Sequence, residues 1–255
     1  MTQATSNETN YENREEQSWT GNKETPRANR IISQRTGHRF GPTLSWIVTL
    51  LVPVALVLTA VRLLLTPAFI QIEYRTPGFP PDPFGFSLED RLYWSNIALD
   101  YLLNDEDISF LADLRFLDGS VVYNQRELAH MVDVKNVVQG TLRVWVASLG
   151  GLLLLGAWAW SGHWIPDYKK GMARGGWLTI LLVGTVIILV LMAFGFFFVA
   201  FHDIFFPPGT WMFAYSDTLI RLFPERFWRD TFLVVGIFSI IGGLVIAYLF
   251  KEKTV

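Results

Sequence analysis

The chain contains no cysteine among its 255 residues. Thiol nucleophiles, disulfide bonds and cysteine-rich metal sites are therefore excluded. Histidine is also scarce, with four residues in the whole chain. Since imidazole is the side chain whose unperturbed pKa lies closest to neutral pH, these four are the first candidates for proton transfer.

Charged side chains are nearly missing from four long apolar runs. A run of about 20 apolar residues is long enough to cross a bilayer. We predict transmembrane helices over 43–65, 141–165, 175–201 and 231–250. A single run of this kind is also found as a buried helix of a soluble protein. Four of them in a chain of this length predict an all-α membrane protein with four transmembrane helices.

Lysine and arginine residues predict the sidedness, because short cytoplasmic loops carry an excess of them. They precede the first run, follow the fourth, and occupy 166–174 between the second and third. Arg226 and Arg229, before the last run, are the exception. We therefore predict a multi-pass protein of the cell membrane with cytoplasmic N and C termini. Residues 166–174 form a cytoplasmic loop in this topology, and 251–255 form a cytoplasmic tail.

The first part of the chain, 1–42, is polar and has few apolar residues to bury. It is predicted to be a disordered cytoplasmic tail. The apolar run that follows starts too late and is too long for the core of a cleaved signal peptide. The first transmembrane helix is therefore expected to be a retained anchor.

Segments 66–140 and 202–230 are predicted to be extracytoplasmic. Over Thr66–Arg143 there are twelve acidic residues and six basic ones. Its four prolines within Thr76–Pro83 predict an extended loop. Ser87 with an acidic residue in the first turn predicts a helix over Leu88–Leu103. The segment is thus expected to fold as a small, mostly helical domain.

Two further features follow in this domain. Asn104 and Asp107 indicate a cap for a short helix, and the turn at Asp118 and Gly119 precedes a short strand predicted at Val121–Tyr123. Asn124 with Glu127 then caps a helix that continues toward the second apolar run. The first connecting segment therefore contributes capping signals at three places.

His130 and His202 are the histidines that this topology places at the same, extracytoplasmic end. A helix running straight from His130 into the second span would hold that residue roughly 12 to 18 Å above the membrane. His202 ends the third span and would not reach it. Gly140 offers a break, and the segment before it is amphipathic. We therefore predict a bend near Gly140 that brings the two histidines together.

Several other residues are candidates for supporting roles. Glu127 and Asp133 lie near His130 on its helix and are positioned to orient its ring, as Asp203 is for His202. Arg62 is a charge inside a span, which is costly and often functional. It either reaches the lipid headgroups or holds a phosphate or a carboxylate. Aromatic residues around His202 form either an interfacial belt or the wall of an acyl-chain slot: Phe198, Phe201, Phe205 and Trp211.

Other interpretations of the two histidines stay open. His130 is also typical of a polar helix surface, and His202 of a polar residue ending a membrane helix. A metal site that uses both histidines with Asp133 or Asp203 ranks lower, because no dense ligand spacing is present. We therefore predict neither a metal nor a cofactor. Nucleic-acid binding is not expected either, because topology explains the basic residues and the net charge is −2.

Three strings carry a family resemblance: ELAHMVDVK at Glu127–Lys135, FHDIFFPPGTWMF at Phe201–Phe213, and SDTLIRLFPERFW at Ser216–Trp228. They resemble the signature segments of the lipoprotein intramolecular transacylase (Lit) family of bacterial membrane proteins. The resemblance extends over about Leu44–Phe250. It implies an acyltransferase that moves the sn-2 acyl chain of a diacylglyceryl-modified lipoprotein onto the α-amino group of its N-terminal cysteine. The family's two functional histidines map onto His130 and His202.

The chemistry is consistent with these residues. Attack of an amine on an ester requires a base for the amine proton, a stabilised oxyanion and a proton for the leaving alkoxide. Two histidines supply a base and an acid, and no covalent intermediate is needed because both reacting groups belong to one molecule. Which histidine takes which role is not decided by the sequence. The alternatives are a non-catalytic membrane protein with a lipid-binding or assembly role and a metal-dependent lipid hydrolase.

Overall fold

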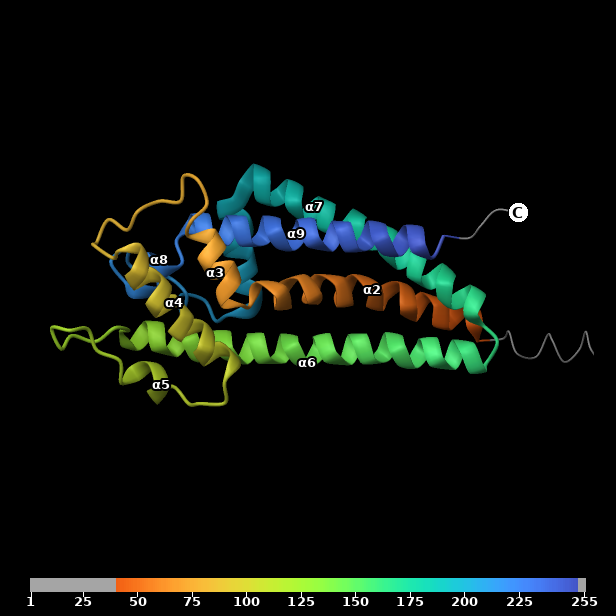
Figure 1. The fold of residues 1–255 in the computed structure, drawn as a ribbon, viewed down its shortest axis with the longest axis horizontal. Helices are drawn as coiled ribbons and strands as arrows, with labels where there is room; N and C mark the ends of the chain where they lie inside the picture. Colours follow the sequence, from red (N-terminus) through yellow and green to blue (C-terminus); the bar gives the residue numbers. More distant parts are fainter. Residues whose placement is uncertain (1–39, 252–255) are drawn as a thin grey trace, which may run out of the picture.

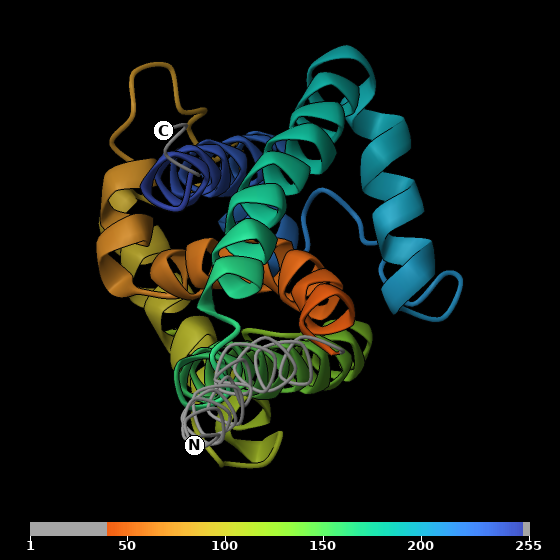
Figure 2. The same ribbon diagram turned by 90° about the vertical axis from the view of Figure 1, so that its right-hand side faces the viewer.

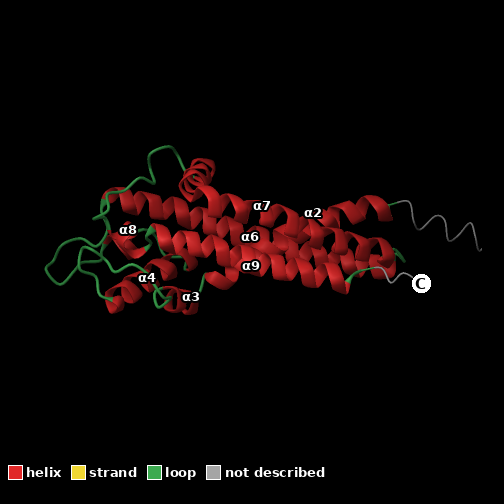
Figure 3. Ribbon diagram, turned by 90° about the horizontal axis from the view of Figure 1, so that it is seen from above, coloured by secondary structure: helices red, strands yellow, loops and turns green. Residues whose placement is uncertain are grey.

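The computed structural model describes residues 40–251, and within this range the regular structure is helical. Four helices are long and apolar enough to cross a membrane. They lie side by side along the long axis of the molecule (Figures 1 and 3). Their bounds are α2 Gly41–Leu64, α6 Gln125–Ser161, α7 Ile165–Phe205 and α9 Glu225–Leu249. The prediction of an all-α protein with four membrane-spanning helices is confirmed, while the predicted tail 1–42 lies almost wholly outside the described residues.

Glycines allow the long helices to approach closely. A Cβ atom placed on Gly176 of α7 would lie 2.5 Å from the carbonyl oxygen of Gly243 in α9. One placed on Gly175 would lie 2.5 Å from Cβ of Val52 in α2. Small residues of this kind are typical of membrane helices that associate through close backbone contact. The α7 helix is thus packed tightly between α2 and α9.

We expect Gly176→Ala to destabilise the protein by about 1–3 kcal/mol, because the added methyl group meets the backbone of α9, which has no flexible end to yield. Gly184→Ala is the matched control on the same helix, since nothing lies within 4 Å of its added Cβ. Thermal unfolding of the two variants in detergent measures the difference. Equal thermal unfolding midpoints for the two variants would show that the contact between α7 and α9 tolerates a wider helix spacing.

Shorter helices gather at one end of the bundle, on the left in Figure 1. They are α3 Pro67–Glu73, α4 Leu88–Leu103, α5 Ser109–Ala112 and α8 Thr218–Leu222. The α4 helix has the predicted bounds, and Ser87 and Asp90 form a reciprocal capping box at its start. Apolar side chains from the two connecting segments, 66–140 and 202–230, form one core here: Ala98, Tyr101, Leu111, Val122, Tyr123, Leu128, Met131, Leu219 and Leu222. The small domain is therefore built from 202–230 as well as from 66–140.

The predicted strand at Val121–Tyr123 is wrong. Within the described residues this segment makes one isolated bridge, between Arg115 and Val121. Val122 and Tyr123 are nevertheless buried in the core. Their β-branched and aromatic character thus reflects burial in a loop, which periodicity over three residues does not distinguish from a strand.

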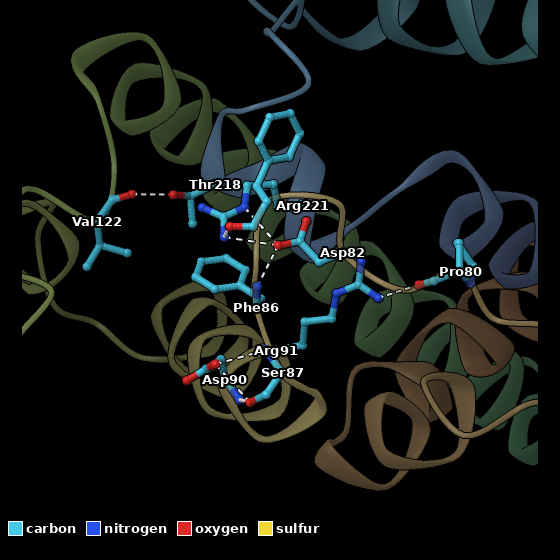
Figure 4. Close-up of polar contacts among 10 residues, drawn as sticks. Pro80, Asp82, Phe86, Ser87, Asp90, Arg91, Val122, Thr218 and Arg221 are labelled. Atoms are coloured by element: carbon cyan, nitrogen blue, oxygen red, sulfur yellow. Dashed lines mark hydrogen bonds and ion pairs between the residues drawn. The ribbon is translucent and has the colours of Figure 1, made fainter.

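The loop that contains Thr76–Pro83 has no helix or strand and is held by two arginines (Figure 4). Arg221 of α8 donates to the Asp82 carboxylate at 3.0 and 3.2 Å. Arg91 of α4 donates to the Pro80 carbonyl at 2.7 Å. The prolines remove backbone donors, so side chains from the neighbouring helices hold the loop in place.

The predicted bend near Gly140 is wrong, because α6 runs without interruption from Gln125 to Ser161. Side chains just before Gly140 form hydrogen bonds that join α6 to the end of α4. Gln139 donates to the Asn104 carbonyl at 3.0 Å, and Lys135 donates to the Asn104 side chain at 3.0 Å. One glycine costs a helix interior only about 1 kcal/mol relative to alanine. This small cost is consistent with a helix that continues through Gly140.

The turn lies in α7 instead. Ala193 has φ −151° and ψ 56°, which are not helical values. The residues after it, 194–205, form an arm that crosses the bundle rather than running along it (Figures 1 and 2). The arm packs on α9 through Phe232, whose ring lies 4.9 Å from Phe197 and 5.3 Å from Phe201. The transmembrane helix predicted over 175–201 thus contains a turn that the sequence did not indicate.

Two loop predictions also change. The α7 helix begins at Ile165, with a proline at its start and Asp167 in its first turn, so 166–174 is helical. Proline and an acidic residue in the first turn are helix-start signals. The α9 helix likewise begins at Glu225, with α8 before it, so 202–230 is partly helical.

Candidate active site

His130 and His202 lie together. Their ring centroids are 6.4 Å apart and the ring planes differ by 23°. Each residue is only 8% exposed. His130 is on the first turns of α6, and His202 is near the end of the α7 arm. The turn at Ala193 therefore does what the bend near Gly140 was expected to do.

His202 is oriented by the backbone of its own helix. Its Nδ1 lies 2.7 Å from the Phe198 carbonyl oxygen. Because a carbonyl only accepts hydrogen bonds, Nδ1 carries the proton in this contact. The other nitrogen, Nε2, therefore carries the lone pair when the ring is neutral, and it is the nitrogen free to take up a proton.

Two nitrogen atoms at this site are buried without a hydrogen-bond partner among the described residues. They are Nδ1 of His130 and the indole Nε1 of Trp211. The Trp211 ring lies 4.7 Å from that of His202. A buried polar group without a partner costs about 1–3 kcal/mol. Such groups are typical of sites that are completed by a ligand.

Aromatic rings enclose the histidines. Of the predicted lining residues, Phe198 and Phe201 lie 4.1 and 5.5 Å from His202. Phe205 is 47% exposed and contacts Phe201 rather than a histidine. Phe206 lies 4.8 Å from His130 and 5.5 Å from His202. The site is therefore apolar on the sides where these rings pack.

Phe206 and Phe213 belong to the aromatic run that the sequence offers either as an interfacial belt or as the wall of an acyl-chain slot. Phe213 lies 5.4 Å from His130. Both belong to the string Phe201–Phe213 that begins beside His202. Their proximity to His130 depends on the way the chain turns back after Phe205. The signal available in the sequence was membership of that string.

Within the described part of the chain, Glu127 forms no hydrogen bond with either histidine ring. Its buried carboxylate accepts from the backbone N–H of Asn124 at 2.8 Å and from that of Leu219 at 2.7 Å. One side chain thus caps α6 and joins it to the start of α8. Asn124 adds a bond at 3.1 Å to Asp217. Glu127 is therefore placed to hold the loop that carries Trp211 and Phe213.

The other predicted supporting residues form no hydrogen bond or ion pair with the two rings among the described residues. Asp203 is exposed, Asp133 is half-buried, and neither has a hydrogen bond or ion pair to a histidine within 40–251. Arg62 donates to the Leu65 carbonyl at 3.3 Å and forms no ion pair with any described residue. Among the described residues, no three histidine, aspartate or glutamate side chains are grouped in a way that would hold a metal ion.

The fold and the site define a class: an integral membrane protein with four long helices and a buried pair of histidines enclosed by aromatic rings at one end of the bundle. The family model of the lipoprotein intramolecular transacylase Lit matches residues 45–228. The chain belongs to this family and is a lipoprotein transacylase-like membrane protein.

Individual relatives agree with this assignment. An uncharacterized protein of Aquifex aeolicus (strain VF5) is 28% identical over 212 residues, covering 80% of this chain and 92% of that protein. A solved structure of Lit from Bacillus cereus is 20% identical and covers 81% of this chain and 94% of its own, with a TM-score of 0.54. A histidine-to-alanine variant of that protein is 17% identical and covers 87% and 95%, with a TM-score of 0.61. At these identities the likeness to the two structures establishes a shared fold.

Proposed function

We propose that this protein moves an acyl chain from the diacylglyceryl group of a membrane lipoprotein to that lipoprotein's N-terminal α-amino group, using His130 and His202. One observation carries the proposal: two imidazoles stacked 6.4 Å apart, buried, and with nitrogens free for a substrate. Membership of the Lit family supplies the substrate class. The proposed site faces the extracytoplasmic side of the cell membrane, in accordance with the distribution of Lys and Arg.

In the proposed reaction the α-amino nitrogen attacks the ester carbonyl, forming the new C–N bond. Nε2 of His202 takes the amine proton, because Nδ1 is already bound to the Phe198 carbonyl. That carbonyl also stabilises the imidazolium that results. His202 then delivers the same proton to the glycerol oxygen as the C–O bond breaks. The proton thus passes from the amine to the alcohol, and the enzyme returns to its initial state.

Two buried nitrogens are suited to the oxyanion: the indole N–H of Trp211, and Nδ1 of His130 when it carries the proton of the neutral ring. His130 and the Trp211 indole each present a nitrogen without a partner beside His202. Donors that are fixed before the reaction stabilise a developing negative charge most effectively where water is excluded. We assign His130 and Trp211 to this role. The rings of Phe198, Phe201 and Phe206 keep water, the competing nucleophile, away from the ester.

Trp211→Phe tests the oxyanion role. We expect kcat to fall about 10²-fold with little change in KM, because the ring remains and only the N–H donor is lost. Trp158→Phe is the control, since that ring is 52% exposed and packs against Trp164, close in sequence to the start of α7. A Trp211→Phe enzyme that is as fast as the wild type would remove Trp211 from the mechanism.

The function itself is tested with a reporter lipoprotein in a host that makes no lyso-form lipoproteins. Mass spectrometry after expression of this protein should show an acyl group on the N-terminal amine and one acyl group missing from the glycerol. An unchanged reporter, in cells where the protein is folded in the membrane, would instead indicate a non-catalytic lipid-binding or assembly role.

A further inference from the structure

A cavity is lined by residues where α7 begins and α9 ends. That end of the bundle is opposite to the one where the short helices gather (Figure 1). The volume of the cavity is about 320 Å³. The lining comes from α7, α9 and the residues just after α9: Lys170, Ala173, Arg174, Trp177, Ala247, Tyr248, Phe250 and Lys251. It shares no residue with the site of His130 and His202. The cavity is therefore a separate site from that of the proposed acyl transfer.

The lining carries three positive charges, Lys170, Arg174 and Lys251, and no acidic side chain. Within the part of the chain that the structure describes, none of the three forms an ion pair. Three like charges around one concavity repel one another unless an anion lies near them. The cavity is thus complementary to a negatively charged group.

Arg174 is held in a defined position, unlike a freely solvated surface arginine. Its Nη2 donates to the Ser45 hydroxyl at 2.6 Å, and its guanidinium lies 4.1 Å from the centre of the Trp46 ring. Its Nε is buried and has no partner among the described residues. A fixed guanidinium loses little freedom on binding and matches the geometry of a phosphate.

Aromatic side chains give the cavity a second character. The Trp177 and Tyr248 rings, from α7 and α9, lie 6.2 Å apart in an edge-to-face arrangement. Tryptophan and tyrosine prefer the level of the lipid headgroups, where one end of the ring is apolar and the other is wet. The cavity therefore combines cations for a phosphate with an amphipathic wall suited to a glycerol backbone.

We propose that this cavity binds the phosphate of an anionic phospholipid. The predicted topology places it at the cytoplasmic leaflet, which is rich in anionic lipid, and basic pockets between membrane helices on that side are typical headgroup sites. The bound lipid bridges the start of α7 and the end of α9. It acts as a structural ligand, distinct from the lipoprotein substrate at the other end.

The test measures the affinity of the detergent-purified full-length protein for phosphatidylglycerol by native mass spectrometry. Phosphatidylglycerol is expected to bind more tightly than phosphatidylcholine. Lys170→Gln should weaken it about fivefold, and the double change Lys170→Gln with Lys251→Gln about 25-fold, since each cation contributes about 1 kcal/mol at an anionic surface. Both lysines are exposed, so the variants are expected to fold.

Lys169→Gln is the matched control, because Lys169 is the exposed neighbour of Lys170 and does not line the cavity. It should leave phosphatidylglycerol binding unchanged. Equal losses for Lys169→Gln and Lys170→Gln, or no loss in the double variant, would overturn the proposal in favour of nonspecific attraction. Competition by free glycerol phosphate would overturn the lipid assignment and indicate a site for a soluble phosphate.

Discussion

Alanine in place of His202 is expected to abolish detectable acyl migration, because His202 both accepts and delivers the transferred proton. General acid–base catalysis is worth about 10²–10⁴-fold in rate. In a reporter lipoprotein assay that loss leaves only the diacylglyceryl form. His130→Ala removes an oxyanion donor and should lower the rate about 10²–10³-fold. Mass spectrometry of the reporter, with membrane levels of each variant matched, measures both effects.

The double variant adds a sharper criterion. Groups that act in one transition state are not additive, so losing both histidines should cost little more than losing His202 alone. His163→Asn is the control, because His163 is an exposed histidine just before α7, far along the chain from His130 and His202. Its φ of 59° is one that asparagine tolerates. Normal acyl migration in His130→Ala or His202→Ala would refute the proposed site.

Glu127→Ala is expected to cause the largest loss of stability outside the bundle. The change leaves the N–H groups of Asn124 and Leu219 without their acceptor, and Glu127 itself is 2% exposed. Each buried unpaired group costs about 1–3 kcal/mol, so the free energy of unfolding should fall by about 3 kcal/mol. Thermal unfolding in detergent measures the loss. Acyl transfer should also fall, because α8 and the loop before it are released from α6.

Asp133→Ala is the control for this prediction. Asp133 is on the same helix, carries the same charge, and its side chain forms no hydrogen bond or ion pair within residues 40–251. The Asp133→Ala change should alter the thermal unfolding midpoint little. If both variants unfolded at the same temperature as the wild type, the capping interaction of Glu127 would be dispensable and the positioning of Trp211 would need another cause.

Features that depend on neighbouring residues were predictable. The α4 helix has the expected bounds because Ser87 and Asp90 satisfy each other's backbone partners within one turn. Asn124 and Glu127 do the same for α6. The helix starts at Ile165 and Glu225 were missed, although proline near both starts was a usable signal. Capping by residues within one turn is therefore predictable from the sequence, but polar helix ends beside apolar runs are easily taken for loops.

The meeting of His130 with His202 shows the limit of local patterns. The expectation that they come together agrees with the geometry, but the bend was placed at Gly140. Glycine is weak evidence for a break, because one glycine costs a helix interior only about 1 kcal/mol relative to alanine. The actual turn is at Ala193, two residues before Gly195, and not at Gly140. It is held by ring contacts between the arm and Phe232 of α9.

By itself the sequence determined the membrane class, the four apolar helices, the capped helices and the two histidines worth testing, because each depends on composition or on residues within a turn of one another. The tertiary structure decided how the histidines meet, that Phe206 and Phe213 enclose them, that Glu127 joins α6 to α8, and that three cations surround one cavity where α7 begins and α9 ends. These are contacts between segments distant along the chain. Their geometry follows from how whole helices pack, which no local pattern encodes.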